Sequence, residues 1–295
     1  MPSPSDTAMV EAVATWFARE ARELPWRADN RSPWGVLVSE VMLQQTPVVR
    51  VAPVWKEWME RWPTPADMAA ASQADVVRAW GRLGYPRRAM RLRECAIALV
   101  AEHGGDVPRE TDQLRALPGI GEYTAAAVRV FAFGERDVVL DTNVRRVIGR
   151  AWHSRPLPPA HLTRPEREHA ASLVPVGSRA SALWNAGAME LGALVCTARA
   201  PRCGACVLAP SCAWVAAGAP GLDQAPRRTQ AWQGTDRQVR GRVMALLRDA
   251  DVPVAVGGHA SLGDVEPGQL DRCLESLVAD GLVTLVSADR GAYAL

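Results

Sequence analysis

Apolar residues recur at helical spacing along the first two thirds of the chain. Within residues 8–24 they include Val10, Val13 and Phe17, the spacing of one helix face. The same pattern predicts further helices at 34–45, 48–61, 67–81, 87–103, 111–116, 122–133, 143–151, 166–174 and 179–193. Proline and glycine interrupt the pattern between these stretches, and no hairpin signal precedes residue 230. This part of the chain is therefore predicted to be all-α.

The pattern changes after a stretch rich in alanine, proline and glycine at 216–231, which we interpret as a linker. Two helices are expected beyond it, near 235–249 and 267–280. The strings LVTLV (282–286) and AYAL (292–295) then flank a short turn, which predicts a hairpin. Helix, helix and hairpin in this order are the outline of a small winged-helix-like α+β domain.

Composition narrows the class of protein. Apolar residues make up 48% of the 295 residues, enough to bury a core. No apolar run reaches the ~18–20 residues that a membrane span needs, and the N-terminus lacks a basic and apolar signal segment. We therefore expect a cytoplasmic protein with no membrane partner, in which clustered cysteines more often hold metal than form disulfides.

The charge balance is less decisive. A net charge of +2 neither demands nor excludes a nucleic-acid partner, because a local basic stripe matters more than the total. Lys56 is the only lysine among the basic residues. A catalytic lysine that forms a Schiff base therefore has almost nowhere to come from.

Four of the six cysteines gather in one short stretch. Cys196, Cys203, Cys206 and Cys212 follow the spacing C-x6-C-x2-C-x5-C. The spacing indicates a metal site, and by itself leaves zinc and an iron–sulfur cluster both open. The six-residue gap is atypical of zinc ribbons, which favour short paired spacings.

The segment LPGIGEYTAAAV (117–128) places Gly119 and Gly121 between two predicted helices. Glycines permit a tight turn and let the backbone approach a ligand closely, and the free N–H groups that open the second helix favour an anion. This is the pattern of a helix-hairpin-helix clamp on a DNA phosphate. An ordinary corner between two helices fits the same residues equally well.

Two carboxylates stand out from their surroundings. Asp141 follows an apolar run and opens a helix, so it either caps that helix or places its carboxylate in a pocket, where Asn143 could hold it. Glu40 lies in the apolar helix WGVLVSEVMLQQ (34–45). A solvated face is the usual place for a glutamate, but apolar neighbours on several sides predict partial burial. Burial would raise its pKa and let it act as an acid near neutral pH.

Six motifs occur in an order that resembles the MutY adenine DNA glycosylases of the helix-hairpin-helix, or endonuclease III, superfamily. They are LPWR (24–27), VSEVMLQQT (38–46), AWGRLGY (79–85), LPGIGEYTAAAV (117–128), LDTNVRRV (140–147) and AMELGALVC (188–196). The resemblance covers about residues 10–215. It implies a mainly α glycosylase fold over 1–215: a six-helix barrel module at about 28–137, and a cluster module formed by the N-terminal helix and about 138–215. The linker at 216–231 and a winged-helix-like domain at 232–295 would follow.

Members of this family remove adenine that is mispaired with 8-oxoguanine. The adenine must first leave the base stack so that the enzyme can reach it. The resemblance implies that Glu40 is the general acid that protonates adenine N7, and that Asp141 stabilises or captures the cationic sugar. Tyr123 would support the same intermediate, and Asn143 would orient the site. The implied partner is double-stranded DNA that contains A:8-oxoG or A:G mispairs, bound by a monomer in the cytoplasm, in association with the nucleoid.

The same resemblance assigns the remaining candidates. The four cysteines would hold a [4Fe–4S] cluster with a structural role, in a loop whose Arg199 and Arg202 face phosphates. The positions that match duplex-entering residues are Gln45 and Tyr85, and those that match the adenine pocket are Arg22, Leu24 and Trp26. Without the resemblance, core packing would be the expectation for Trp26 and Tyr85.

Single residues distinguish this function from three alternatives. The endonuclease III branch carries a lysine at the position of Tyr123, so a glycosylase with lyase activity is the nearest alternative, and the tyrosine favours a monofunctional enzyme. A non-catalytic iron–sulfur redox sensor that binds DNA, or a structural zinc protein, would need none of the three candidate catalytic side chains.

The chain also departs from the family. Pro86 stands where the family usually repeats tyrosine, Ala186 replaces a longer polar residue near the adenine pocket, and only ~65 residues follow the linker, too few for a MutT-like domain.

Overall fold

The computed structural model describes residues 3–222 and 232–295. Internal contacts divide the chain into two units, which are described separately. Among the described residues, the first unit comprises 3–40, 108–116 and 120–222, and the second comprises 41–107, 117–119 and 232–295. This division does not follow the expected module boundaries, which stay predictions. Part of the expected linker at 216–231, residues 223–231, lies outside the described residues.

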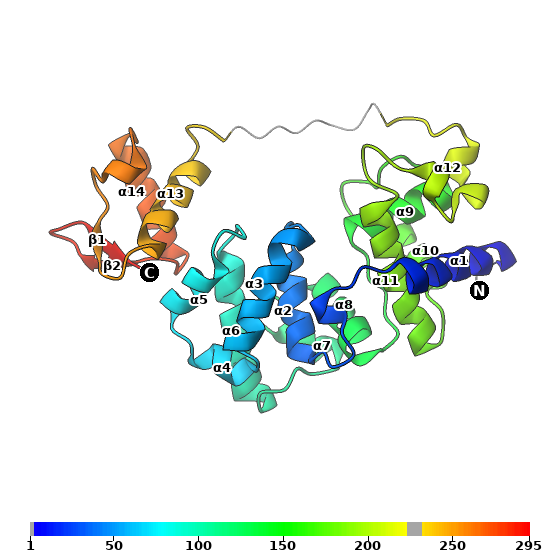
Figure 1. The fold of residues 1–295 in the computed structure, drawn as a ribbon, viewed down its shortest axis with the longest axis horizontal. Helices are drawn as coiled ribbons and strands as arrows, with labels where there is room; N and C mark the ends of the chain where they lie inside the picture. Colours follow the sequence, from blue (N-terminus) through cyan, green and yellow to red (C-terminus); the bar gives the residue numbers. More distant parts are fainter. Residues whose placement is uncertain (1–2, 223–231) are drawn as a thin grey trace. The chain divides into compact units, whose positions relative to one another are not determined.

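The first unit is helical (Figure 1). Its helices are α1 (Pro4–Glu20), η1 (Pro25–Arg27), the start of α2 (Pro33–Leu43), α7 (Thr111–Ala116), α8 (Glu122–Phe133), α9 (Thr142–His153), α10 (Arg164–Leu173), α11 (Ser178–Leu194), η2 (Cys203–Ala205), η3 (Ala209–Ser211) and α12 (Ala213–Ala216). Helix α11 contacts α1, α8 and α9, and their apolar faces share a core with α10 and the cysteine loop. Two glycines of α11, Gly187 and Gly192, allow the close packing: a Cβ on Gly187 would lie 2.9 Å from the side chain of Val13.

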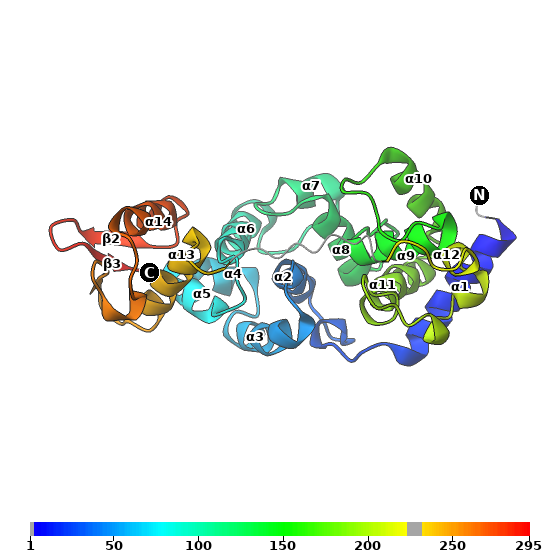
Figure 2. The same ribbon diagram turned by 90° about the horizontal axis from the view of Figure 1, so that it is seen from above.

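The second unit contains a group of helices and the C-terminal domain. Its elements are α3 (Val48–Arg61), α4 (Pro65–Ala70), α5 (Gln73–Trp80), α6 (Arg87–His103), α13 (Asp236–Arg248), β1 (Val254–Ala255), η4 (Ala260–Leu262), α14 (Pro267–Ala279), β2 (Thr284–Ser287) and β3 (Ala292–Ala294). Helix α6 contacts both α4 and α5, and α13 packs against α14. Figure 2 shows α13 and α14 beside the small sheet from a second direction.

The expected C-terminal domain is confirmed as two helices and a hairpin. Strands β2 and β3 pair antiparallel, with Leu285 opposite Tyr293. A short strand that the sequence pattern did not predict, β1, pairs with the other edge of β3 and gives the order β1-β3-β2. No strand precedes residue 230 in the described part of the chain, as expected.

Two expected helix boundaries are wrong. The stretch 67–81 forms two helices, because Ser72 adopts an extended backbone and its side chain caps α5 by accepting from the Asp75 N–H. The N-terminal helix begins at Pro4 and ends at Glu20, earlier than the expected 8–24, since Ser3 and Asp6 form a capping box at its start. Within 3–222 and 232–295, no helix is long and apolar enough to cross a membrane.

Candidate active site

Glu40 is buried in the apolar helix α2, as its neighbours predicted. Its relative exposure is 7%, and Val36, Leu37 and Val41 beside it are also buried. Oε2 of its carboxylate accepts a hydrogen bond from the Tyr123 hydroxyl at 3.1 Å. The first turn of α8 therefore brings its tyrosine to the carboxylate of α2.

The surroundings of Glu40 leave a substantial fraction of its carboxyl groups protonated near neutral pH. Burial, which disfavours the charged form, raises the pKa of Glu40 to about 7. The Tyr123 hydrogen bond opposes this rise, the negative charge of Asp141 adds to it, and the positive charge of Arg27 opposes it. A carboxylic acid with this pKa can donate a proton at physiological pH.

Asp141 caps a helix, the first of the two alternatives that the sequence left open, and Asn143 holds its carboxylate. It is the N-cap of α9, where Oδ1 accepts from the Val144 N–H at 2.7 Å. Its other oxygen, Oδ2, accepts from Nδ2 of Asn143 at 2.7 Å. Burial raises the pKa of Asp141, and these hydrogen bonds oppose the rise. The cap therefore also fixes the direction in which the carboxylate points.

Asn143 is held in turn by a buried arginine that sequence reasoning did not single out. Arg146 donates from Nη2 to Oδ1 of Asn143 at 2.8 Å and from Nε to the carbonyl of Cys196 at 2.6 Å. Its Nη2 also donates to the carbonyl of Gly192, where a Cβ would lie 2.7 Å from the Cβ of Asn143. A continuous set of hydrogen bonds thus runs from Asp141 to the backbone of the first clustered cysteine.

Arg22, expected in the adenine pocket, is engaged in a buried ion pair. Its Nε and Nη2 donate to the two oxygens of Glu190 at 2.7 and 2.8 Å, and Arg27 donates to the same carboxylate at 3.0 Å. Glu190 is 1% exposed. Although burial opposes it, hydrogen bonding and the two positive charges lower the pKa of Glu190 to about 2. Sequence reasoning missed Glu190, whose only signal was a carboxylate in the apolar string AMELGALVC.

The other expected base contacts occupy distinct settings. In the first unit, Trp26 is buried and Leu24, at the start of η1, is partly buried. In the second unit, Gln45 and Tyr85 are exposed, and both have positive φ, 56° and 48°. Left-handed backbone is uncommon for residues other than glycine, and such strain clusters at functional sites.

The four clustered cysteines line one cavity in the first unit. Within the described residues, no group of three or more His, Cys, Asp or Glu is arranged to hold a single metal ion. Arg150, which is 1% exposed, reaches the wall of this cavity. It donates to Sγ of Cys196 at 3.4 Å and to the carbonyls of Thr197 and Ala198 at 2.8 and 2.9 Å.

The expected DNA contacts lie on exposed turns. Gly119 has a φ of +78°, and a Cβ there would lie 3.0 Å from the Cβ of Arg91, so the turn requires glycine. Gly121 is the N-cap of α8 and is exposed. Arg199 and Arg202 are also exposed, and Arg202 donates from one nitrogen to the carbonyl of Leu194.

Comparison with known proteins agrees with this geometry. The sequence profile of the HhH-GPD superfamily base excision DNA repair proteins matches residues 38–171. An adenine DNA glycosylase of Mycobacterium tuberculosis (strain CDC 1551 / Oshkosh) is 50% identical over 289 residues, which cover 96% of this chain and 94% of that protein.

Two solved structures resemble the chain. A thermostable thymine-DNA glycosylase matches with a TM-score of 0.65 at 28% identity, over 72% of this chain and 97% of that one. An endonuclease III in a non-covalent DNA complex shares the fold, with a TM-score of 0.62 at 24% identity over 74% and 99% of the two chains. The superfamily profile and the relative that is 50% identical over 96% of the chain show that the chain belongs to the adenine DNA glycosylases of the HhH-GPD superfamily.

Proposed function

We propose that this protein hydrolyses the N-glycosidic bond of adenine mispaired with 8-oxoguanine, or with guanine, in double-stranded DNA. The observation that carries the proposal is the pairing of two carboxyl groups in different environments. Glu40 is buried against apolar side chains with a pKa of about 7, while Asp141 is held by a backbone N–H and an amide. Carboxyl groups whose pKa values are driven apart by their surroundings are suited to separate acid and charge-stabilising roles.

In the proposed mechanism Glu40 gives its proton to N7 of the adenine, which makes the base a good leaving group. As the bond breaks the sugar becomes cationic, and the Asp141 carboxylate stabilises or captures it, as in a retaining glycosidase. Asn143 keeps the carboxylate aimed, and the Tyr123 hydroxyl supports the same intermediate from beside Glu40.

Strand cleavage through a Schiff base is not part of this proposal. Tyr123 stands where the endonuclease III branch carries its lysine, and the sole lysine of the chain, Lys56, lies in α3 of the second unit. Borohydride trapping on an A:8-oxoG duplex should give no strong covalent adduct, and such an adduct would sink the monofunctional assignment.

The exposed residues are proposed as DNA contacts. Gln45 and Tyr85 would enter the duplex, and Arg199, Arg202 and the Gly119–Gly121 turn would contact phosphates. Adenine would lie against Leu24 and Trp26. Arg22 would reach it from its ion pair with Glu190. Because Ala186 is short, no polar contact to the base is assigned to that position.

We also propose that Cys196, Cys203, Cys206 and Cys212 hold a [4Fe–4S] cluster. All four line one cavity, and a four-iron cluster needs its thiolates around a larger volume than a single ion does. When bound, the cluster would supply a rigid anchor for its loop. The buried guanidinium of Arg150 would offset the negative charge of the thiolates. Visible absorbance of the purified protein distinguishes this cluster from zinc.

The decisive experiment compares single-turnover adenine release from A:8-oxoG and A:G duplexes by a monomeric preparation of the protein. Asp141→Asn should abolish release and leave duplex binding largely intact, because the cap geometry is kept while the charge is lost. Undiminished release by this variant would overturn the catalytic assignment. No release by the wild-type protein would favour a binding protein, such as a redox sensor, over an enzyme.

A further inference from the structure

The C-terminal domain contacts the loop that carries Tyr85. This loop, residues 81–86, joins α5 to α6 in the second unit, and we call it the Tyr85 loop. At its start, Arg248 of α13 donates to the carbonyl of Gly81. Just beyond its end, Arg87 forms an ion pair with Asp280, which Arg240 of α13 also contacts. The domain therefore holds the loop at both ends.

An apolar core supports these polar contacts. Val77 of α5 and Met90 of α6, which flank the Tyr85 loop, share a core of buried side chains with Val239 and Val243 of α13. Arg78 adds a hydrogen bond to the carbonyl of Ala250 at 3.0 Å. The helices that flank the Tyr85 loop therefore share an apolar core with the C-terminal domain, and burial of apolar side chains favours this contact.

One side chain of the domain reaches the centre of the loop. The guanidinium carbon of Arg237 lies 5.3 Å from the ring centroid of Tyr85 and 5.6 Å from that of Trp232. Arg88 lies 5.8 Å from the same tyrosine ring. These distances are within cation–π range, so two arginines contact the Tyr85 ring. Tyr85 remains 50% exposed, which leaves ring surface for a base.

Arg88 connects this ring to the second candidate residue for duplex entry. It donates from Nη1 to the carbonyls of Val41 and Gln44, at 2.9 and 2.6 Å, and from Nη2 to the carbonyl of Gly84 at 2.9 Å. The turn that bears Gln45 and the Tyr85 loop are thus both hydrogen-bonded to one partly buried arginine.

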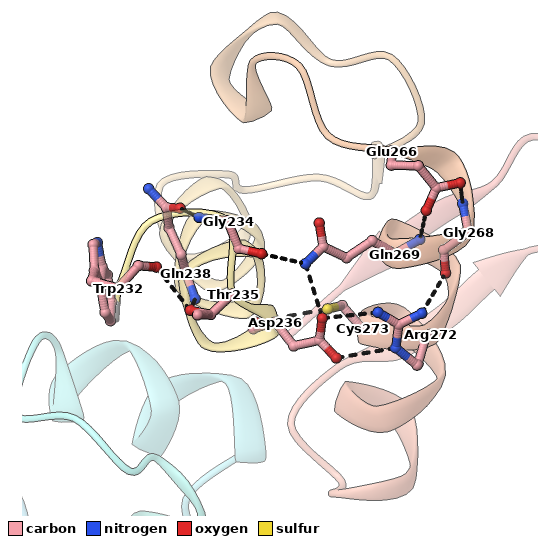
Figure 3. A network of polar contacts seen from close by, with 10 residues as sticks. All are labelled: Trp232, Gly234, Thr235, Asp236, Gln238, Glu266, Gly268, Gln269, Arg272 and Cys273. Atoms are coloured by element: carbon pink, nitrogen blue, oxygen red, sulfur yellow. Dashed lines mark hydrogen bonds and ion pairs between the residues drawn. The ribbon is translucent and has the colours of Figure 1, made fainter. Parts of the chain in front are cut away.

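The helix that carries Arg237 is itself anchored at its start (Figure 3). Gln269 of α14 donates to the carbonyl of Gly234 at 3.0 Å and to Asp236 at 2.9 Å, and Arg272 pairs with Asp236 at 3.0 Å. Thr235 donates to the carbonyl of Trp232 at 2.8 Å. The backbone just before Arg237 is therefore fixed to α14.

The charge of α14 argues against direct reading of DNA by this domain. In a helix-turn-helix the second helix enters the major groove. Here that helix carries Asp271 and Glu275, with Glu266 at its start, and its one arginine, Arg272, is paired with Asp236. Acidic side chains on this face would repel phosphates. A role through contact with the Tyr85 loop fits the charges better.

We propose that Arg237 is a positioning residue: through the Tyr85 ring, it holds the Tyr85 loop in the conformation that enters a mispaired duplex. This inference rests on the proposed function, in which Tyr85 contacts DNA. The C-terminal domain thereby contributes to mispair recognition without touching the bases itself.

The test is a double-mutant cycle in the full chain, with Arg237→Ala, Tyr85→Ala and the double variant. The readouts are the single-turnover rate of adenine release and affinity for an uncleavable A:8-oxoG duplex relative to a fully paired one. Arg237→Ala should reduce mispair-specific affinity about 2- to 5-fold, the scale of one exposed cation–π contact. It should have almost no effect in the Tyr85→Ala background.

Two further measurements separate positioning from a phosphate contact. Arg237→Lys should restore most of the affinity, while Arg237→Gln should not. The salt dependence of binding should keep its slope in Arg237→Ala, whereas loss of a phosphate contact would lower the slope by about one. The matched control is Arg242→Ala, at an exposed position of the same helix, where the guanidinium donates to the carbonyl of Leu262.

Three results would overturn the assignment of Arg237. They are a full loss of mispair-specific affinity when Arg237→Ala is added to Tyr85→Ala, a lower salt slope of binding in Arg237→Ala, and an equal loss of affinity in Arg242→Ala. If Arg237→Ala unfolds, the comparison of the Lys and Gln variants decides instead. Failure of the proposed function is a separate outcome, since it requires that the wild-type protein release no adenine.

Discussion

Removal of the Tyr123 hydroxyl should shift the pH dependence of adenine release upward. In the structure this hydroxyl donates to the Glu40 carboxylate at 3.1 Å, and the bond lowers the pKa of a carboxyl that burial has raised to about 7. A hydrogen bond to a charged group contributes about 1.5–3 kcal/mol, and one pKa unit corresponds to about 1.4 kcal/mol. Tyr123→Phe should therefore raise the pKa of Glu40 by at least about one unit.

The sign follows from the role of the acid. A general acid works while it is protonated, so the rate falls as the pH rises through its pKa. In Tyr123→Phe that fall should begin at higher pH, and the variant should keep a larger fraction of its own maximum above neutral pH. The maximum rate itself is expected to be lower, because in the proposed mechanism the hydroxyl also supports the intermediate. The midpoint, however, does not depend on the size of the maximum.

The assay is kcat/KM for adenine release across the pH range, which reports the free enzyme to which the geometry applies. Tyr293→Phe is the matched control, since it removes a hydroxyl from β3 of the C-terminal domain. It should leave the midpoint in place. An unchanged or lowered midpoint in Tyr123→Phe would refute the assignment of Glu40 as the acid or of Tyr123 as its partner.

Three stability measurements probe the buried charges. The pKa of Glu40 is raised to about 7 in the folded protein, so the stability that this group contributes is lost as the pH rises from about 4.5 through about 7. Glu40→Gln does not titrate and keeps its stability over this range. In urea titrations its free energy of unfolding, relative to that of the wild type, should therefore be about 3 kcal/mol higher at alkaline pH than at acid pH. Glu190 is the opposite case, because its pKa is lowered to about 2. Glu190→Gln should lower the free energy of unfolding in urea by about 3 kcal/mol at neutral pH, and this loss should shrink as the pH falls below about 4.5. Arg150→Met should lower the free energy of unfolding by about 3 kcal/mol and remove the visible absorbance of the proposed cluster, because buried carbonyls and a thiol lose their hydrogen-bond donor. The control Arg155→Met, at an exposed position, should change the free energy of unfolding by less than about 0.5 kcal/mol. An unchanged free energy of unfolding in Glu190→Gln or Arg150→Met would contradict the roles given to these groups. So would a stability difference between Glu40→Gln and the wild type that does not change with pH.

The elements that sequence reasoning predicted well depend on local pattern. The burial of Glu40 followed from apolar neighbours on several sides of one helix, and the C-terminal hairpin followed from two alternating strings. Both misplaced helix boundaries have a local cause too. Ser3 and Ser72 are each followed three residues later by an aspartate, a capping signal that the apolar pattern obscured.

The burial of three charged side chains could not be predicted in the same way. Arg146, Arg150 and Glu190 are 5%, 1% and 1% exposed, yet each lies in a stretch that would also suit a solvated side chain. Their burial depends on partners far away in the sequence, such as Cys196 for Arg146 and Arg22 for Glu190. Tertiary partners decide whether a charged group can be buried, and no periodicity reports them.

The two carboxyl groups of the candidate site show why chain position matters as much as burial. Burial raises the pKa of both Glu40 and Asp141. Glu40 lies in the interior of α2, where the backbone N–H groups are used within the helix, so its charged form is favoured by the Tyr123 hydroxyl and the positive charge of Arg27 rather than by the backbone. Asp141 lies at the start of α9, where a free N–H, the Asn143 amide and the positive end of the helix dipole all favour the carboxylate. The same residue chemistry therefore yields a proton donor in a helix interior and a stabiliser of positive charge at a helix start.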